Sequence, residues 1–156
     1  MVKEELKSAI IEASIAKDWG TAAKEWACVG IERSDDPSIC ICGHSPIVNL
    51  CYLENTKTKT ELIVGNCCVQ YFDNIYTGEH AKFFSAIEKH KINRTVIDLA
   101  FASGIVNLWE CKFLYNVSRK RKFTRKQADC YKVLVEKVFD KIQTNPKHIL
   151  INGWKK

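Results

Sequence analysis

Apolar residues recur at helical spacing near the start of the chain. Over residues 3–18, Leu6 and Ile10 fall on one helix face while lysines and glutamates fall on another, which predicts an amphipathic helix. Gly20 is expected to end this helix, because glycine favours helix termini. A second, short helical turn is expected over residues 22–26.

The next part of the chain has short apolar runs separated by polar turns, a pattern typical of strands. Residues 28–31 are apolar and β-prone, and residues 34–38, with the sequence SDDPS, predict a loop. Two further apolar runs, at 46–53 and 61–64, flank the polar sequence NTKTKT. This arrangement predicts a β-hairpin.

Helical signals return after the hairpin. Asn66 is expected to cap a helix that reaches Phe72. Apolar residues then recur at helical spacing over residues 79–90 and again over residues 95–102. These two segments predict the first helices of a helical region.

Two capped helices are expected to complete the chain as a helical hairpin. Asn107 is the expected cap of the first helix, and Thr124 opens a T-x-x-Q capping box for the second. Trp109 is expected to lie in the core between them. Pro146 is expected to end the second helix, and residues 148–156 to be irregular. The apolar residues expected to pack between the two helices are Trp109, Phe113, Leu114, Tyr131, Leu134 and Val138.

Together these elements predict an α+β fold. Three parts are expected: an N-terminal helix over residues 1–20, a zinc-clipped β-hairpin module over 21–75, and a helical region over 76–156. The helical region is expected to contain three or four helices with a basic turn between two of them. A chain of 156 residues is long enough to bury a core without disulfide bonds.

Eight cysteines would suit a secreted disulfide protein, but their placement indicates otherwise. Four of them gather in the sequences CICGH and CC, at 40–44 and 67–68. The first residues carry scattered lysine and glutamate and no signal sequence. We therefore expect a cytoplasmic protein with reduced or metal-bound thiols. No transmembrane helix is expected, since no apolar stretch approaches about 18 residues.

Cys40, Cys42 and His44 lie within five residues, a density of soft ligands typical of a structural zinc site. A C-x-C pair supplies two thiolates from one tight turn. A third ligand is expected from Cys67 or Cys68 at the far end of the hairpin. Adjacent side chains point apart, so both rarely bind one ion, and Cys68 is the expected ligand.

The fourth zinc ligand is less constrained by spacing. His44 is nearest in the sequence and is the expected fourth ligand, and the alternatives are Cys67, Cys51 and Cys28. Without a metal, the same cysteines would be ordinary buried thiols, because free cysteine is among the most buried residue types.

Signatures of an enzyme are absent. The chain has no zinc-deaminase or HExxH pattern, no P-loop and no GxGxxG. The GHS at 43–45 lacks the GxSxG frame of a hydrolase. Glu79, His80 and His90 share one predicted helix and are expected to be exposed. We therefore expect the protein not to be an enzyme.

The net charge of +6 is concentrated in one place. Residues 119–126, here called the basic turn, carry six positive charges in eight residues. Such a cluster is a candidate phosphate-binding patch, and the alternative is a solvated basic helix end. The six are Arg119, Lys120, Arg121, Lys122, Arg125 and Lys126.

The segment 22–72 resembles a Cys-rich module of uncharacterised phage and large-virus proteins. That module has a tryptophan, CICG, an apolar strand with an asparagine, and VGxxCVxxF. The resemblance implies zinc binding and a viral or prophage source, and its pattern includes Cys68. The matching residues are Trp26, Cys40, Cys42, Gly43, Ile47, Asn55, Val64, Gly65, Cys68, Val69 and Phe72.

The segment 103–138 is similar to a tail found in phage and plasmid replication-associated proteins. The shared pattern is G-I followed by W-E, then F-L, a basic turn, and K-Q at the start of a helix. This resemblance implies a role near DNA metabolism. The matching residues are Gly104, Ile105, Trp109, Glu110, Phe113, Leu114, Phe123, Thr124, Lys126 and Gln127.

These observations predict a virus- or phage-encoded zinc-binding accessory protein that binds nucleic acid, DNA rather than RNA, in the host cytoplasm. Exposed aromatic residues would add base stacking, and the candidates are Tyr52, Tyr71, Phe72 and Trp154. The alternative is an inhibitor that binds a host defence protein, of an anti-CRISPR or anti-restriction type. No membrane partner is expected. The expected phosphate-binding residues are Arg119, Arg121, Lys122, Arg125 and Lys126.

Overall fold

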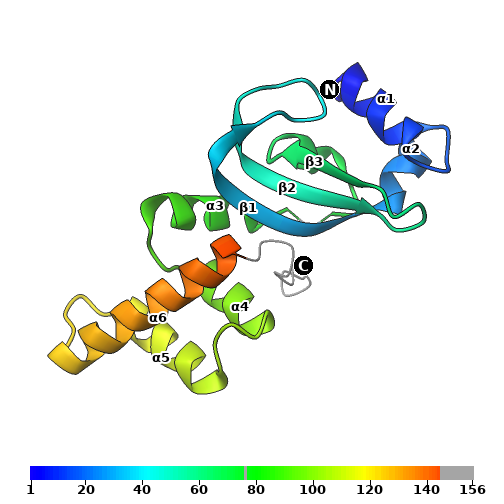
Figure 1. Ribbon diagram of the computed structural model, residues 1–156. Helices are drawn as coiled ribbons and strands as arrows, with labels where there is room; N and C mark the ends of the chain where they lie inside the picture. The colour runs from blue at the N-terminus through cyan, green and yellow to red at the C-terminus, as the bar shows by residue number, and fades with distance from the viewer. Residues whose placement is uncertain (76, 145–156) are drawn as a thin grey trace. The chain divides into compact units, whose positions relative to one another are not determined.

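The computed structural model describes residues 1–75 and 77–144. The chain divides into two compact units, an N-terminal unit of residues 1–78 and a C-terminal unit that begins at Glu79. A three-stranded antiparallel sheet with short helices forms the first, and four α-helices form the described part of the second (Figure 1). The predicted α+β class is therefore confirmed. Within the described ranges, no helix is both long and apolar enough to cross a membrane.

The sheet has the strand order β1-β2-β3. The predicted hairpin is confirmed as β2 (Ile47–Asn55) and β3 (Glu61–Gly65). Asn55 begins the turn between them, where its backbone N–H donates to the carbonyl of Thr60 at 2.9 Å. β2 also pairs with β1 (Trp26–Ser38), so the hairpin is the larger part of a three-stranded meander.

Strand β1 is longer than the sequence pattern predicts. It starts at Trp26 and continues through the SDDPS segment, which we expected to be a loop. The pairing moves from Arg33 with Asn49 directly to Ser38 with Ile47. Four residues of β1, 34–37, therefore lie opposite the single residue Val48 of β2, and they form an irregularity within the strand.

The N-terminal helix is shorter than predicted, because a tertiary contact ends it. Helix α1 spans Glu4–Glu12 rather than residues 3–18. The Ser14 hydroxyl donates to the Ile10 carbonyl at 2.6 Å. The next two backbone N–H groups, of Ile15 and Ala16, each donate to the Glu25 carboxylate at 2.9 Å instead of continuing the helix.

The predicted short helical turn consists of α2 (Trp19–Ala22) and the 3-10 turn η1 (Ala23–Glu25). Asp18 caps α2 by accepting from the Thr21 backbone N–H at 2.9 Å. Trp26, which we placed in this turn, is instead the first residue of β1. The turn thus carries the chain from α1 to the sheet.

A buried polar network joins these helices to the sheet. The Asn55 amide donates to the Glu25 carboxylate at 3.0 Å, and the Trp26 indole donates to the Ser14 hydroxyl at 2.8 Å. Asn55 is fully buried, and its side-chain oxygen accepts from two backbone N–H groups of the β2–β3 turn. The Asn55 hydrogen bond, with the N–H groups of Ala16 and Ile15, lowers the pKa of Glu25 from its ordinary 4.5 to about 2 despite burial.

The segment after β3 forms less helix than predicted. Residues 66–72 contain only the 3-10 turn η2 (Cys68–Tyr71), and Asn66 does not cap it. The residue before the turn is Cys67, whose side chain makes no capping hydrogen bond. This compact turn directs Cys68 inward, where its side chain is buried.

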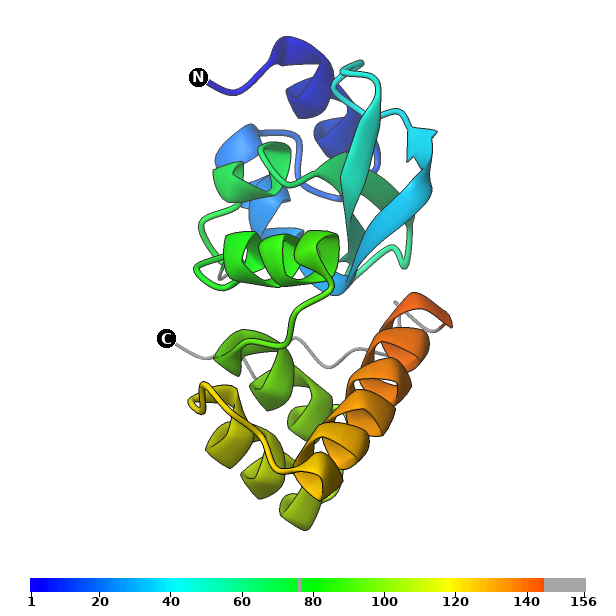
Figure 2. The same cartoon turned by 90° about the vertical axis from the view of Figure 1, so that its left-hand side faces the viewer.

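The C-terminal unit contains α3 (His80–Lys89), α4 (Arg94–Ala102), α5 (Leu108–Ser118) and α6 (Arg125–Thr144). Both views show α6, in orange, beside α5 (Figures 1 and 2). The apolar faces of the four helices contain the buried residues of this unit. The predicted ends at Pro146 and over 148–156 lie outside the described residues. Fully buried members of the core include Phe83, Val96, Ile97, Leu99, Leu114, Val117 and Val138.

The predicted caps of α5 and α6 are confirmed. The Asn107 side chain accepts from the Glu110 backbone N–H at 2.9 Å, and the Glu110 carboxylate accepts from the Asn107 N–H at 2.8 Å. Thr124 and Gln127 form the same reciprocal pair at 3.1 and 3.2 Å. These boxes set the start of each helix and so define the residues left between them.

We expect Asn55→Ala to destabilise the N-terminal unit by about 2–4 kcal/mol, because it leaves buried donors and acceptors without partners. Urea unfolding followed by circular dichroism measures this change. Asn116→Ala, at an exposed position of α5, is the matched control and is expected to change stability by less than about 0.5 kcal/mol. Equal effects of the two substitutions would contradict the network.

Glu25 should also make stability depend on pH. Its folded pKa of about 2 lies below the ordinary 4.5, so its contribution is complete above pH 4.5 and is lost as the pH falls toward 2. We expect Glu25→Gln to be less stable than wild type at neutral pH and to lose less further stability on acidification. Urea unfolding at several pH values tests this, and parallel acid dependences of the two proteins would refute it.

Candidate metal centre

The first two thiols come from one tight turn. The Gly43 N–H donates to the Cys40 carbonyl at 2.8 Å, and the Cys40 N–H donates to the His44 carbonyl at 3.0 Å. Gly43 has φ of +83°, a left-handed conformation that favours glycine. The turn closes tightly enough for Cys40 and Cys42 to present their side chains to the same point.

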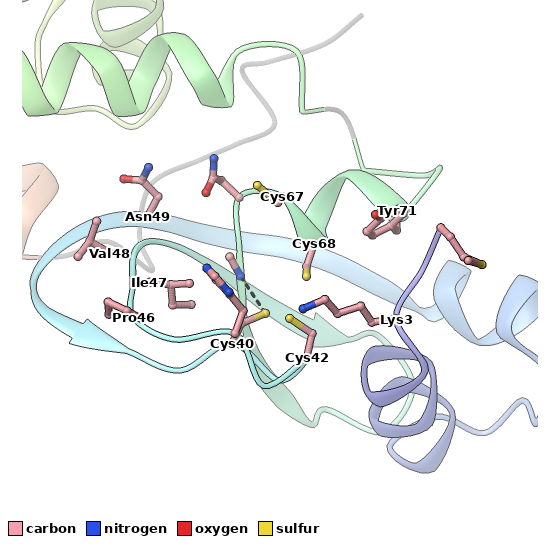
Figure 3. A pocket seen from close by; sticks show the side chains of 14 residues that line it. Lys3, Cys40, Cys42, Pro46, Ile47, Val48, Asn49, Cys67, Cys68 and Tyr71 are labelled. Carbon is pink, nitrogen blue, oxygen red and sulfur yellow. Dashed lines mark hydrogen bonds between the residues drawn. The ribbon is translucent and has the colours of Figure 1, made fainter.

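The third thiol arrives from the other end of the hairpin. Cys68 opens η2, three residues after β3 ends at Gly65. The Gly65 N–H donates to the Cys40 sulfur at 3.3 Å, which ties β3 directly to the turn. In Figure 3 the thiols of Cys40, Cys42 and Cys68 point toward one another.

These three thiols form a compact, buried group. Their sulfur atoms all lie within 4.8 Å of one another, and the three residues are 2%, 5% and 8% exposed. Three thiolates bound tetrahedrally to one zinc ion at about 2.3 Å would lie about 3.8 Å apart. A small inward movement would therefore bring Cys40, Cys42 and Cys68 to metal-binding distance. They form a candidate metal site, as the sequence predicted.

The surroundings act differently on the thiols. Burial opposes ionisation of Cys42, but the His44 backbone N–H, the two neighbouring thiols and Lys3 outweigh it and lower the pKa of the Cys42 thiol. Burial, reinforced by the neighbouring thiols, raises the pKa of Cys68. A bound cation would favour thiolate at all three positions.

Within residues 1–75 and 77–144, no fourth ligand atom groups with the three sulfur atoms. His44 and Cys67 are both exposed, and His44 as fourth ligand stays a prediction. Cys51 is fully buried in β2, where the neighbouring Cys28 thiol and burial raise its pKa well above the ordinary value. Cys28 and Cys51 thus form a separate thiol pair within the sheet.

A pocket of about 440 Å³ adjoins the three thiols (Figure 3). Lys3, Ile47 and Tyr71 contribute to its walls, as do the exposed His44 and Cys67. The pocket gives an ion access to the buried sulfur atoms. It also leaves room for a fourth ligand, either a side chain or a water molecule.

The basic turn lies in the C-terminal unit and its cations are all exposed. Helix α5 ends at Ser118 and α6 begins at Arg125, so four of the six cations lie in the connection and two in the first turn of α6. The five predicted phosphate-binding residues, Arg119, Arg121, Lys122, Arg125 and Lys126, are therefore free of the core.

An open depression of about 670 Å³ beside this turn adds residues that sequence reasoning missed. The Arg94 guanidinium lies 5.9 Å from the centre of the Tyr115 ring and 3.9 Å from the Asp98 carboxylate. The spacing of Lys112 seven residues before Arg119 was a signal, since residues seven apart share a helix face. The lining residues are Arg94, Lys112, Tyr115, Asn116, Arg119 and Lys120.

The prediction that Trp109 lies in the core is wrong. Trp109 is 63% exposed, and its ring stacks on Phe113 with centroids 5.5 Å apart and planes 13° apart. The buried face of α5 is set by Cys111, Leu114 and Val117. Trp109 precedes Cys111 by two residues, about 200° around the helix, and so points to solvent.

The other predicted stacking residues are less suitable. Phe72 is 1% exposed and packs edge-on against Trp19. The Tyr52 hydroxyl donates to Glu32, and burial together with this contact raises the pKa of Tyr52 to about 12. Tyr71 is 36% exposed and lines the pocket beside the thiols. Trp154 lies outside the described residues.

The expectation that His80 is exposed is also wrong. Its side chain is buried, and burial lowers the pKa of His80 to about 4. Glu79 accepts from the Thr95 hydroxyl and from Lys82. His90 ends α3 in a left-handed conformation and lies against the Phe139 ring. These three residues have structural surroundings and do not converge on one point.

We expect Cys40→Ser, Cys42→Ser and Cys68→Ser each to lose bound metal and to unfold the N-terminal unit. A structural zinc ion supplies on the order of 10 kcal/mol of folding free energy, so loss of one thiolate removes most of it. Metal analysis of purified protein, combined with circular dichroism, measures both effects. Cys130→Ser in α6 is the control, and unchanged metal content in all four variants would contradict the site.

Comparison of the chain with protein-family models, curated proteins and solved structures found no significant match. Neither resemblance noted in the sequence gains support from these comparisons. The metal site and the basic turn are therefore argued below from the residues of this chain and their arrangement.

Proposed function

We propose that this protein is a zinc-binding accessory protein that binds nucleic acid through its basic turn. The observation that carries the proposal is the placement of charge. The chain has 24 Lys and Arg against 18 Asp and Glu, and six of the cations lie in residues 119–126. The other 18 cations equal the acidic residues in number, so the turn alone accounts for the net charge.

This concentration suits a polyanion. Lys and Arg side chains that neutralise phosphates release condensed counterions, which supplies affinity without sequence preference. All six cations of the turn are exposed, and Arg94 and Lys112 extend the positive surface along the adjoining depression. The charge of the turn does not distinguish DNA from RNA, and we propose DNA only because of the sequence pattern noted over residues 103–138. The viral or phage source that we propose rests on the pattern of residues 22–72, and the proposed location in the host cytoplasm rests on the absence of a signal sequence.

Zinc is the metal we propose for the thiol group. Three buried thiolates favour zinc or another soft metal over magnesium or calcium, which prefer oxygen ligands. Its role is structural, because it would hold the turn at Cys40–Gly43 to the start of η2 across the hairpin. His44 is the proposed fourth ligand.

Charge removal tests the nucleic-acid proposal. We expect a variant with glutamine at residues 119, 121, 122, 125 and 126 to bind labelled single-stranded DNA at least about tenfold more weakly at low salt. Log affinity decreases linearly with log salt concentration, and the magnitude of that slope should be smaller by about 0.7 for each phosphate that the variant no longer neutralises. Fluorescence anisotropy over a salt series measures both. The matched charge control is a variant with glutamine at five other exposed lysines, at residues 24, 89, 91, 132 and 141.

Two outcomes of this experiment would count against the proposal. Wild-type protein that binds neither DNA nor RNA at low salt would refute it. Equal losses in the variant and in the control would show that net charge, and not the turn, decides binding. A protein partner retained from host lysate after nuclease treatment, without nucleic-acid binding, would support the alternative of a defence inhibitor.

A further inference from the structure

Trp109 and Phe113 form an aromatic pair on α5 that is not part of the buried core, since Trp109 is exposed and Phe113 is half-buried. Trp109 is 63% exposed, and its ring lies nearly parallel to that of Phe113. Leu108, beside it, is 55% exposed. Exposed large aromatic side chains are enriched at binding surfaces, where they supply contact area with little loss of conformational freedom.

The pair shares a helix face with the basic depression. Trp109, Lys112, Phe113 and Asn116 follow the spacing of three and four residues that places side chains side by side on a helix. Lys112 and Asn116 also line the depression, which continues to Arg119. The distance along the helix from Trp109 to Arg119 is about 15 Å at a rise of 1.5 Å per residue. That length is roughly four stacked nucleotides at 3.4 Å each.

The charge along this face is almost entirely positive. Residues 108–126 contain seven Lys and Arg and one acidic residue, Glu110. The Glu110 carboxylate is occupied by Lys137 at 3.0 Å and by its own helix cap. At the other side of the depression, Arg94 lies over the Tyr115 ring and partly neutralises Asp98. Little negative charge therefore opposes an approaching phosphate.

A surface that combines cations with a stacking platform fits single strands better than duplex. In a duplex the base faces already stack on one another, whereas in a single strand they are free to stack on aromatic side chains. We propose that the exposed face of α5 binds single-stranded nucleic acid, with bases stacked on Trp109 and Phe113 and the backbone following Lys112, Arg119 and Arg94. This inference rests on the proposed function and specifies its substrate.

Substitution of Trp109 tests it by anisotropy with a labelled oligothymidine and a duplex of equal length. We expect wild type to prefer the single strand, and Trp109→Ala to weaken that binding roughly 5- to 150-fold, the range seen when a stacking residue is removed. Trp109→Phe should restore most of the affinity, and duplex binding should be unchanged. Phe101→Ala removes another exposed aromatic residue of the C-terminal unit and should have no effect.

Tryptophan fluorescence gives a second, independent readout. Trp26 is fully buried and Trp19 packs on Phe72. In a Trp154→Phe background, which removes the remaining tryptophan, an exposed, stacking Trp109 should dominate quenching by an unlabelled oligothymidine. We expect this quenching in that background and its loss when Trp109→Phe is added, while circular dichroism shows that the fold is retained.

The outcomes separate this inference from the proposed function. If charge removal in the basic turn abolishes binding while Trp109→Ala keeps full affinity for the single strand, the inference is overturned and the proposed function stands. Tighter binding of duplex than of single strand would overturn it in the same way. If the wild-type protein binds no nucleic acid, both the inference and the proposed function are overturned, and this also holds if the α5 face binds a protein instead.

Discussion

The Glu25 carboxylate is the point at which three segments of the N-terminal unit meet. It accepts from the backbone after α1 and from the Asn55 side chain at the end of β2, and Lys57 lies 3.7 Å away. A buried charge is stable only when such donors surround it. These hydrogen bonds hold the end of α1 against the sheet and so fix the position of the residues that precede α1. One of these residues, Lys3, lines the pocket beside the thiols.

Within that framework, the convergence of Cys40, Cys42 and Cys68 depends on local backbone hydrogen bonds more than on side-chain packing. Cys40 and Cys42 are presented by a turn that closes through Gly43, and the Gly65 N–H bonds the Cys40 sulfur. Cys68 follows at once in η2. A metal ion would thus connect two backbone segments that the β2–β3 hairpin has already brought together, which lowers the entropy lost on binding.

Short sequence patterns correctly predicted the features that depend on residues close together in the chain. The hairpin, the Asn107 cap, the Thr124 box and the convergence of three cysteines followed from turn composition, capping residues and ligand spacing. The errors have two sources, a tertiary contact at α1 and a misjudged helix phase at α5. Glu25 ends α1 early by taking backbone donors that a helix would use. Trp109 was assigned to the core from its apolar character, whereas the phase of the buried α5 residues turns it outward.

The basic turn has a consequence for the lifetime of the chain. Six peptide bonds that follow Lys or Arg lie within eight residues. Their side chains are exposed, and four of these residues lie between α5 and α6, outside any helix. Proteases that cleave after basic residues therefore find their densest group of sites on the same short connection that would hold phosphates. A bound polyanion would shield this connection, so occupancy and resistance to cleavage would rise together.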